Sequence, residues 1–159
     1  MNELLKLLKK NAQESPRNIA KMLRISEKEV RKRISRYEKQ GVIRGYQAIV
    51  NEDKLSLNRV SAVIEVKITP EREGGFDRIA SRISRFQEVE SVFLTSGTYD
   101  LLVFVEGQNL REVASFVSAR LATIEGVLST STHFMLKTYK DHGVLMDEEK
   151  KDERLKVTP

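Results

Sequence analysis

The N-terminal third of the chain is organised by residues 15–43, which read SPRNIAKMLRISEKEVRKRISRYEKQGVI. Ser15 followed by Pro16 indicates a helix start, because serine caps free amides and proline is tolerated at the first helical position. A second helix start follows at Ser26, and Gly41 is placed to end that helix. The stretch therefore predicts two helices joined by a short turn, the helix-turn-helix pattern.

The second of these helices has one apolar and one cationic side. Val30, Ile34 and Tyr37 recur at helical spacing and should pack inward. A cationic face opposite an apolar one suits the major groove of double-stranded DNA, whose walls are phosphates and whose guanine edges offer acceptors. The expected DNA contacts are Ser26, Lys28, Arg31, Lys32, Ser35, Arg36 and Lys39.

Position along the helix divides these contacts into two kinds. The N-terminal end of a recognition helix normally meets the bases, which makes Lys28, Arg31 and Lys32 the expected base contacts. Arg36 and Lys39 lie further along and are the expected phosphate contacts.

Two side chains near this helix have a local structural interpretation. Ser26 and Glu29 have the spacing of a capping box, in which each side chain bonds the main-chain amide of the other. Arg33 lies beside the apolar stripe, where it can pair with a carboxylate and cover apolar surface or join the DNA contacts.

The distribution of charge also favours a polyanionic partner for the N-terminal part. Residues 1–50 contain 13 Lys and Arg against 5 Asp and Glu, whereas residues 51–159 contain 15 against 18. A basic module on a mildly acidic remainder is typical of a nucleic-acid-binding protein, although a solvated basic surface has the same composition.

The C-terminal part reads as strand, helix, two strands, helix and strand. The apolar patterns predict strands over 60–68, 89–96, 99–106 and 127–139, a tight turn at Gly97-Thr98, and helices over 76–86 and 110–124. This βαββαβ order is the ferredoxin-like arrangement. The last three strands carry apolar residues on both faces, so the face without helices is expected to be covered by a second copy of the chain.

These elements give an α+β chain with a winged-helix-like helix-turn-helix domain and a ferredoxin-like domain. A leucine-rich helix ending at Asn11 precedes residue 15, and an extended segment runs from Val42 to about Val50. The expected divisions are a DNA-binding domain over 1–46, a linker strand or hinge over 47–58, an effector-binding and oligomerisation domain over 59–140, and a charged tail over 141–159.

In this combination the chain resembles the Lrp/AsnC, or feast/famine, transcription regulators of bacteria and archaea. The resemblance covers about residues 3–140. The residues that carry it are Ile19-Ala20, Ile25-Ser26, Val30, Arg33-Ile34, Gly41-Val42-Ile43, Gly45-Tyr46-Gln47-Ala48, Gly97-Thr98-Tyr99-Asp100-Leu101-Leu102, Gly126-Val127, Thr130, Thr132 and Leu136-Lys137.

The resemblance implies a transcription regulator that forms dimers, which assemble into octamers or similar rings. It also implies a small effector, an amino acid or a similar molecule, held between dimers by the turn Gly97, Thr98, Tyr99 and Asp100 with Thr130 and Thr132 opposite. Turn amides suit a carboxylate, Asp100 suits an ammonium, and threonine hydroxyls add neutral hydrogen bonds. The alternative is a plain Gly-Thr hairpin with a strand-capping aspartate.

One residue departs from the pattern of the family. The turn between the two helices usually carries glycine or another permissive residue where Arg24 stands in this chain. A positive φ at Arg24 would cost ~1 kcal/mol.

Several other function classes lack the residues that they need. The chain has no cysteine, its only histidines are His133 and His142, and no catalytic or phosphate-loop motif is present, so no enzyme, cofactor or metal site is expected. No membrane span or signal peptide is expected either, which favours a cytoplasmic protein. The remaining alternative is an architectural protein that packs DNA without an effector.

Overall fold

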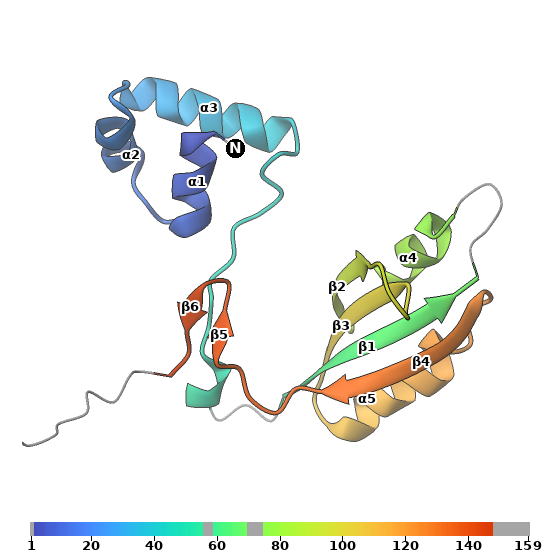
Figure 1. Cartoon of the computed structure of the whole chain (residues 1–159). Helices are drawn as coiled ribbons and strands as arrows, with labels where there is room; N and C mark the ends of the chain where they lie inside the picture. Colours follow the sequence, from blue (N-terminus) through green and yellow to red (C-terminus); the bar gives the residue numbers. More distant parts are fainter. Residues whose placement is uncertain (1, 56–58, 70–74, 148–159) are drawn as a thin grey trace, which may run out of the picture. The chain divides into compact units, whose positions relative to one another are not determined.

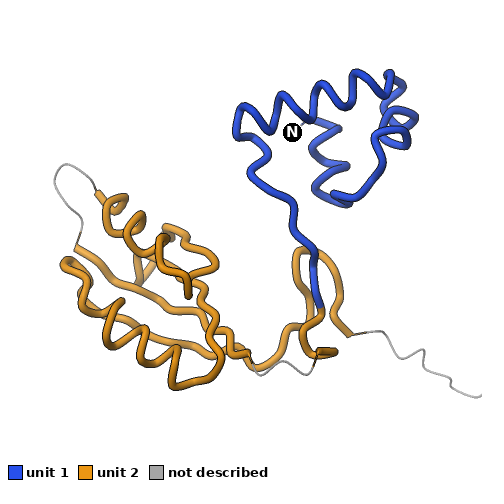
Figure 2. The backbone as a smooth tube through the Cα atoms, turned by 180° about the vertical axis from the view of Figure 1, so that it is seen from behind, with its two compact units in different colours: residues 1–50 blue, residues 51–159 orange. Residues whose placement is uncertain are grey.

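The computed structural model describes residues 2–55, 59–69 and 75–147 and divides the chain into two compact units, residues 1–50 and residues 51–159 (Figures 1 and 2). The first unit holds the three N-terminal helices, and the second holds the sheet with its two helices and a small hairpin.

The first unit contains α1 (Glu3–Lys10), α2 (Pro16–Leu23) and α3 (Glu27–Lys39). Each helix begins after a residue whose side chain accepts a hydrogen bond from a free amide of the first turn. These capping residues are Asn2, Ser15 and Ser26. The helix starts predicted at the two serines are therefore confirmed.

One face of each helix meets the others in a common core. Its buried members are Leu4, Leu8, Ile19, Ala20 and Val30. Partly buried apolar side chains surround them, including Ile25 from the turn and Ile43 from the segment after α3. Residues 44–50 follow without strand pairing, so the predicted linker strand has no partner strand in the described chain.

Both α2 and α3 end in a left-handed turn closed by the same pair of hydrogen bonds. Arg24 has φ +54°, and the amide of the next residue donates to the carbonyl of Ala20 over 3.1 Å. Gly41 has φ +67°, and the amide after it donates to the carbonyl of Tyr37 over 2.9 Å. These are Schellman motifs, which usually place glycine at the left-handed position. The structure thus gives Arg24 the positive φ that glycine would adopt without strain.

The second unit is built on a four-stranded antiparallel sheet with strand order β2-β3-β1-β4 (Figure 1). Its strands are β1 (Val60–Ile68), β2 (Val89–Leu94), β3 (Leu101–Gly107) and β4 (Val127–Phe134). Its helices are α4 (Asp77–Ile83) and α5 (Leu110–Phe116), which continues into the π-helical η2 (Val117–Leu121). The predicted βαββαβ order is confirmed.

Both helices cover the same face of this sheet. Alternate residues of β1 and β3 point into the core between sheet and helices, among them Ile64, Val66 and Val103. Gly126, between η2 and β4, has φ +92°, and a Cβ there would lie 2.6 Å from the Ile79 side chain. Only glycine fits this junction without displacing the core.

The last strand is shorter than predicted. β4 ends at Phe134 rather than near Tyr139, because its only neighbour is β1, and the final bond joins the Met135 amide to the Ser61 carbonyl over 2.9 Å. β1 itself begins only one residue before Ser61, at Val60.

A small hairpin follows, made of β5 (Lys140–Asp141) and β6 (Val144–Leu145). The side chain of Asn51, which precedes the short 3₁₀ helix η1 (Glu52–Lys54), donates to the carbonyl of Met146 over 2.6 Å. The charged tail predicted from residue 141 therefore starts inside a folded hairpin, and residues 148–159 lie outside the described chain.

Exchanging residue types at the two left-handed positions should change stability in opposite directions. We expect Arg24→Gly to raise the free energy of unfolding by up to ~1 kcal/mol, because it removes strain without removing a side-chain contact. Gly41→Ala should lower it by ~1 kcal/mol for the converse reason. Urea unfolding followed by helical circular dichroism measures both changes, and a destabilised Arg24→Gly variant would contradict the strain at this turn.

Candidate nucleic-acid interface and effector region

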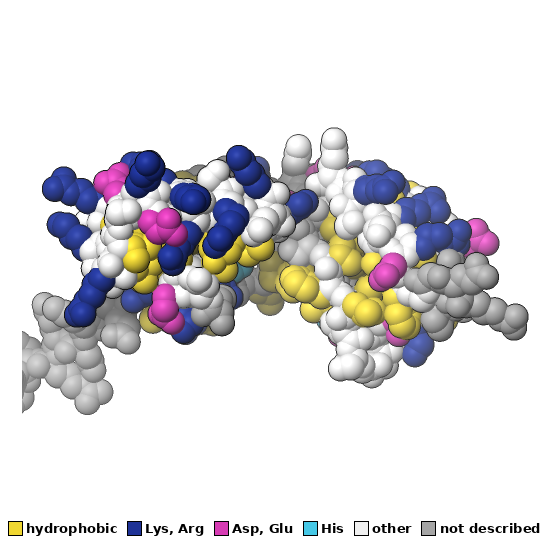
Figure 3. Space-filling view, turned by 90° about the horizontal axis from the view of Figure 1, so that it is seen from above, with side chains coloured by type: hydrophobic (Ala, Val, Ile, Leu, Met, Phe, Trp, Pro, Cys, Tyr) yellow, Lys and Arg dark blue, Asp and Glu magenta, His cyan; other side chains and the backbone are white. Residues whose placement is uncertain are grey.

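The outer face of α3 carries the densest group of cations in the first unit. Val30 is fully buried and faces the core, while Lys28, Lys32 and Lys39 are exposed away from it. Dark blue Lys and Arg side chains crowd this part of the helical unit in Figure 3. All seven predicted contact residues are exposed on or just before α3.

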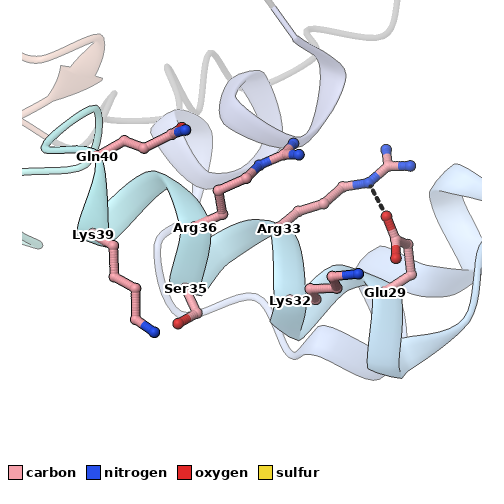
Figure 4. A pocket seen from close by; sticks show the side chains of 7 residues that line it. All are labelled: Glu29, Lys32, Arg33, Ser35, Arg36, Lys39 and Gln40. Atoms are coloured by element: carbon pink, nitrogen blue, oxygen red, sulfur yellow. Dashed lines mark hydrogen bonds and ion pairs between the residues drawn. The ribbon is translucent and has the colours of Figure 1, made fainter.

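A shallow hollow follows this face. The side chains that line it come from α3, among them Lys32, Arg36 and Lys39, and from Gln40 directly after the helix (Figure 4). The one carboxylate in the hollow belongs to Glu29. Such an open, mainly cationic surface offers donors to an extended polyanion.

Two of the arginines on α3 are already paired within the helix. Arg31 Nη2 lies 2.7 Å from Glu27 Oε1, and Arg33 Nε lies 2.7 Å from Glu29 Oε1. Both are solvent-accessible i,i+4 pairs, which contribute little to stability. The Lys28 ammonium, by contrast, has no hydrogen bond or ion pair with any described residue, and the same holds for the ammonium groups of the lysines at 32 and 39.

The predicted capping box is only half formed. The Ser26 hydroxyl accepts the Glu29 amide over 3.2 Å, as predicted. The Glu29 carboxylate does not return to the Ser26 amide but bonds Arg33, whose cation lowers the pKa of Glu29. A charge-assisted bond is stronger than one to a neutral amide, so the arginine takes the carboxylate. Arg33 therefore adopts the carboxylate-paired role, the first of the two roles considered for it.

Sequence reasoning missed a bond that ties the segment after α3 to the helix. Tyr46 Oη donates to Glu38 Oε1 over 2.9 Å. Partial burial of the phenol and the adjacent carboxylate raise the pKa of Tyr46. The spacing of eight residues across a turn carries no periodic signal that would have indicated this contact.

The effector region predicted around Gly97–Asp100 is a six-residue turn, longer than the expected hairpin. β2 stops at Leu94 and β3 starts at Leu101. The turn closes on itself where the Thr95 amide donates to the Asp100 carbonyl over 2.8 Å, and it also bonds to β1. The Asp100 amide donates to the Val66 carbonyl over 3.1 Å, and its carboxylate accepts the Ile68 amide over 2.9 Å.

Asp100 therefore already has the strand-capping role that was the alternative to effector binding. Lys67, not singled out from the sequence, also reaches the turn, and its ammonium donates to the Thr98 carbonyl over 3.1 Å. The Asp100 carboxylate keeps further acceptor positions, since a carboxylate can accept about four hydrogen bonds.

Within one chain the two threonines lie apart from this turn. Thr130 and Thr132 pair with Val66 and Ile64 on one side of β1, whereas β3 and the turn lie on its other side. Register partners point to the same face, so both threonines lie on the helix-covered face. β1 therefore stands between the turn and the two threonines.

The two histidines occupy exposed positions. His133 Nε2 lies 3.3 Å from Glu65 Oε2 and 3.2 Å from Ser131 Oγ, and His142 pairs with Asp141. Within residues 2–55, 59–69 and 75–147, no three His, Cys, Asp or Glu side chains gather in a way that could hold a metal ion. No helix in this part of the chain is long and apolar enough to cross a membrane.

Family models match both units. Residues 2–44 match a winged helix-turn-helix DNA-binding model, and residues 61–145 match the Lrp/AsnC ligand-binding domain.

Curated relatives and solved structures agree with these models. The chain is 45% identical to the uncharacterised HTH-type transcriptional regulator YugG of Bacillus subtilis, over 99% of this chain and 95% of YugG. It is 30% identical to the HTH-type transcriptional regulator FL11 of Pyrococcus abyssi, over 87% of this chain and 88% of FL11.

The solved structure of the transcriptional regulator NMB0573 of Neisseria meningitidis, a complex with L-Met, has the same fold. Its TM-score is 0.68 at 22% identity, over 89% of this chain and 93% of that one. The paired DNA-binding and ligand-binding models and the relatives at this coverage place the chain in the Lrp/AsnC family of transcriptional regulators.

Proposed function

We propose that this regulator reads specific DNA sequences by inserting α3 into the major groove. The observation that carries the proposal is the outer face of α3, where the ammonium groups of Lys28, Lys32 and Lys39 form no bond within the described chain. Arg31 can leave Glu27 and bind DNA with little loss of stability, because this ion pair is exposed and such pairs contribute only about 0–1 kcal/mol. Serine hydroxyls at 26 and 35 add neutral donors along the same helix.

A free amino acid is the proposed effector. The match to a ligand-binding domain supports this, as does the L-Met bound to the related fold of NMB0573. In this chain the turn supplies main-chain amides, the remaining acceptor positions of Asp100, and a cation at Lys67 within reach of Thr98. Thr130 and Thr132 of a neighbouring chain would complete the site.

The sheet face without helices is the proposed contact with a second copy. Phe93 and Phe104 pack edge to face there with ring centroids 5.8 Å apart, and Phe93 is 53% exposed. A large exposed aromatic beside Leu102 is unfavourable in water and typical of an interface. Dimers formed in this way would be the units of an octamer or similar ring, as the family resemblance implies.

Architectural packing of DNA without an effector stays the second candidate, favoured by the cations of the first unit beyond α3. Affinity for a selected duplex relative to random duplexes at one salt concentration separates the two, since a packing protein has little preference.

Base reading predicts a difference between two kinds of alanine variant. A duplex selected from a random pool should lose ~1–3 kcal/mol of binding free energy on Lys32→Ala or Arg31→Ala, with a smaller loss on random DNA. Lys39→Ala should weaken both duplexes equally, because a phosphate carries no sequence information. Fluorescence anisotropy at fixed salt measures this, and equal losses on both duplexes at positions 31 and 32 would reject base reading there.

Effector binding predicts that the charge of Asp100 matters more than its hydrogen bond to β1. Asp100→Asn keeps an acceptor for the Ile68 amide and removes the charge that attracts an ammonium. We expect titration calorimetry with the twenty amino acids to find a ligand that Asp100→Asn binds about 10- to 100-fold more weakly. Asp77→Asn, an exposed acid on α4, is the matched control. Equal binding by both variants would remove Asp100 from the site.

The second-copy contact predicts that one exposed aromatic controls assembly. Phe93→Lys should convert the full chain from dimers or larger assemblies to monomers in sedimentation equilibrium at micromolar concentration, because it introduces a charge into an apolar interface. Leu110→Lys is the matched control, since Leu110 is exposed to a similar degree, 57% against 53% for Phe93, but lies on α5. A monomeric parent chain would overturn the proposal.

A further inference from the structure

A second cationic surface lies outside α3, on α2 and the residue that ends it. Between Ser15 and Ser26 the chain has three cations, Arg17, Lys21 and Arg24, and no acidic residue. Arg17 and Lys21 are one helical turn apart on α2, away from the buried Ile19 and Ala20, so they share an exposed side. We call these three cations the α2 ridge.

The side chains of the α2 ridge have no bonded partner in the described part of the chain. None of these three side chains is in a hydrogen bond, ion pair or ring contact with a described residue. On α3 the situation differs, because Arg31 and Arg33 each hold a carboxylate four residues away. The flanking acids Glu14 and Glu27 bond Asn18 and Arg31 instead, so the side chains of the ridge have no bonded partner among the described residues.

Arg24 is the most informative member of the ridge. It adopts φ +54° and ψ +43°, a conformation that only glycine adopts without strain. The main-chain bonds that close α2 need this conformation but not this side chain, since a glycine would make the same bonds. No contact of the guanidinium within the described chain compensates for the strain. Strain of this kind typically persists at functional positions.

The position of Arg24 indicates what it can contact. It lies two residues before Ser26, the cap of α3, so it is next to the helix end that is proposed to approach the bases. In helix-turn-helix complexes the helix before the recognition helix crosses the DNA backbone. An exposed guanidinium at this place suits bidentate bonds to a phosphate.

We infer that the α2 ridge binds DNA phosphates beside the groove that α3 enters, with Arg24 as its principal contact. The inference rests on the proposed DNA-binding function and adds to it a binding surface on a second helix. Because a phosphate contact is independent of sequence, the ridge strengthens binding to selected and random duplexes alike and adds to the salt dependence.

The test combines stability with DNA affinity at the same residue. Arg24→Gly and Arg24→Asn both allow a left-handed backbone and both remove the charge. We expect each to bind selected and random duplexes about 5- to 10-fold more weakly at 0.1 M salt, and to reduce the slope of log K against log salt by ~1. Arg24→Gly should nevertheless unfold at a temperature ~2–4 °C higher than the parent chain. Damage to the fold would not produce greater stability together with weaker binding.

Further variants separate the effect of the side-chain charge from the effect of the backbone conformation. Arg24→Lys keeps the charge and should retain most of the salt slope. Arg17→Ala combined with Lys21→Ala should lower the slope further than either change alone. Arg111→Ala, which removes an exposed charge from α5 in the other unit, is the control and should leave affinity and slope unchanged.

The outcomes distinguish this inference from the proposed function. If the parent chain binds DNA and Lys39→Ala weakens it, but Arg24→Gly and Arg24→Asn bind like the parent, the α2 ridge is not a contact and the role of α3 stands. If the parent chain binds no duplex at low salt, both the proposed function and the ridge are rejected.

Discussion

The turn between α2 and α3 is the constraint on which the DNA-binding unit depends. Three consecutive residues set it: Arg24 reverses the chain in a left-handed conformation, Ile25 packs against the core, and Ser26 caps α3. The first acts through backbone conformation, the second through apolar packing and the third through a hydrogen bond, and together they fix the direction in which α3 leaves the turn. Every cation on the outer face of α3 takes its position from this passage, because the helix is rigid once it has started.

The charges on α3 fall into two groups for a local reason. Acids at 27 and 29 stand in the first turn, where they interact favourably with the positive end of the helix dipole. Each also pairs with an arginine four residues later, which leaves the lysines at 28, 32 and 39 without acidic partners. The helix thus gains stability from its arginine pairs while its lysines stay available to a partner.

Sequence reasoning succeeded where contacts are local and failed where they are distant. The local sequence predicts the caps at Ser15 and Ser26 and the helix end at Gly41, because each depends on residues only three to five positions away. The end of β4 depends on the length of β1, some seventy residues earlier, and no local pattern records it.

The candidate sites divide in the same way. Periodicity alone could place the α3 cations on one face, because a single helix determines their geometry. The Asp100 carboxylate accepts a hydrogen bond from the Ile68 amide, and β1 stands between the turn and the threonines of β4. Both facts follow from strand order, which residue spacing within a segment does not encode.

The attachment of the 95–100 turn to β1 makes it part of a continuous hydrogen-bonded path. Asp100 holds the main chain on both sides of Lys67, where the pairing of β1 with β4 shifts register. The next amide, of Thr69, donates to the Gly126 carbonyl over 2.8 Å, at the junction of η2 and β4. The turn is therefore no independent loop: displacing it strains the central strand and, through that strand, the far edge of the sheet.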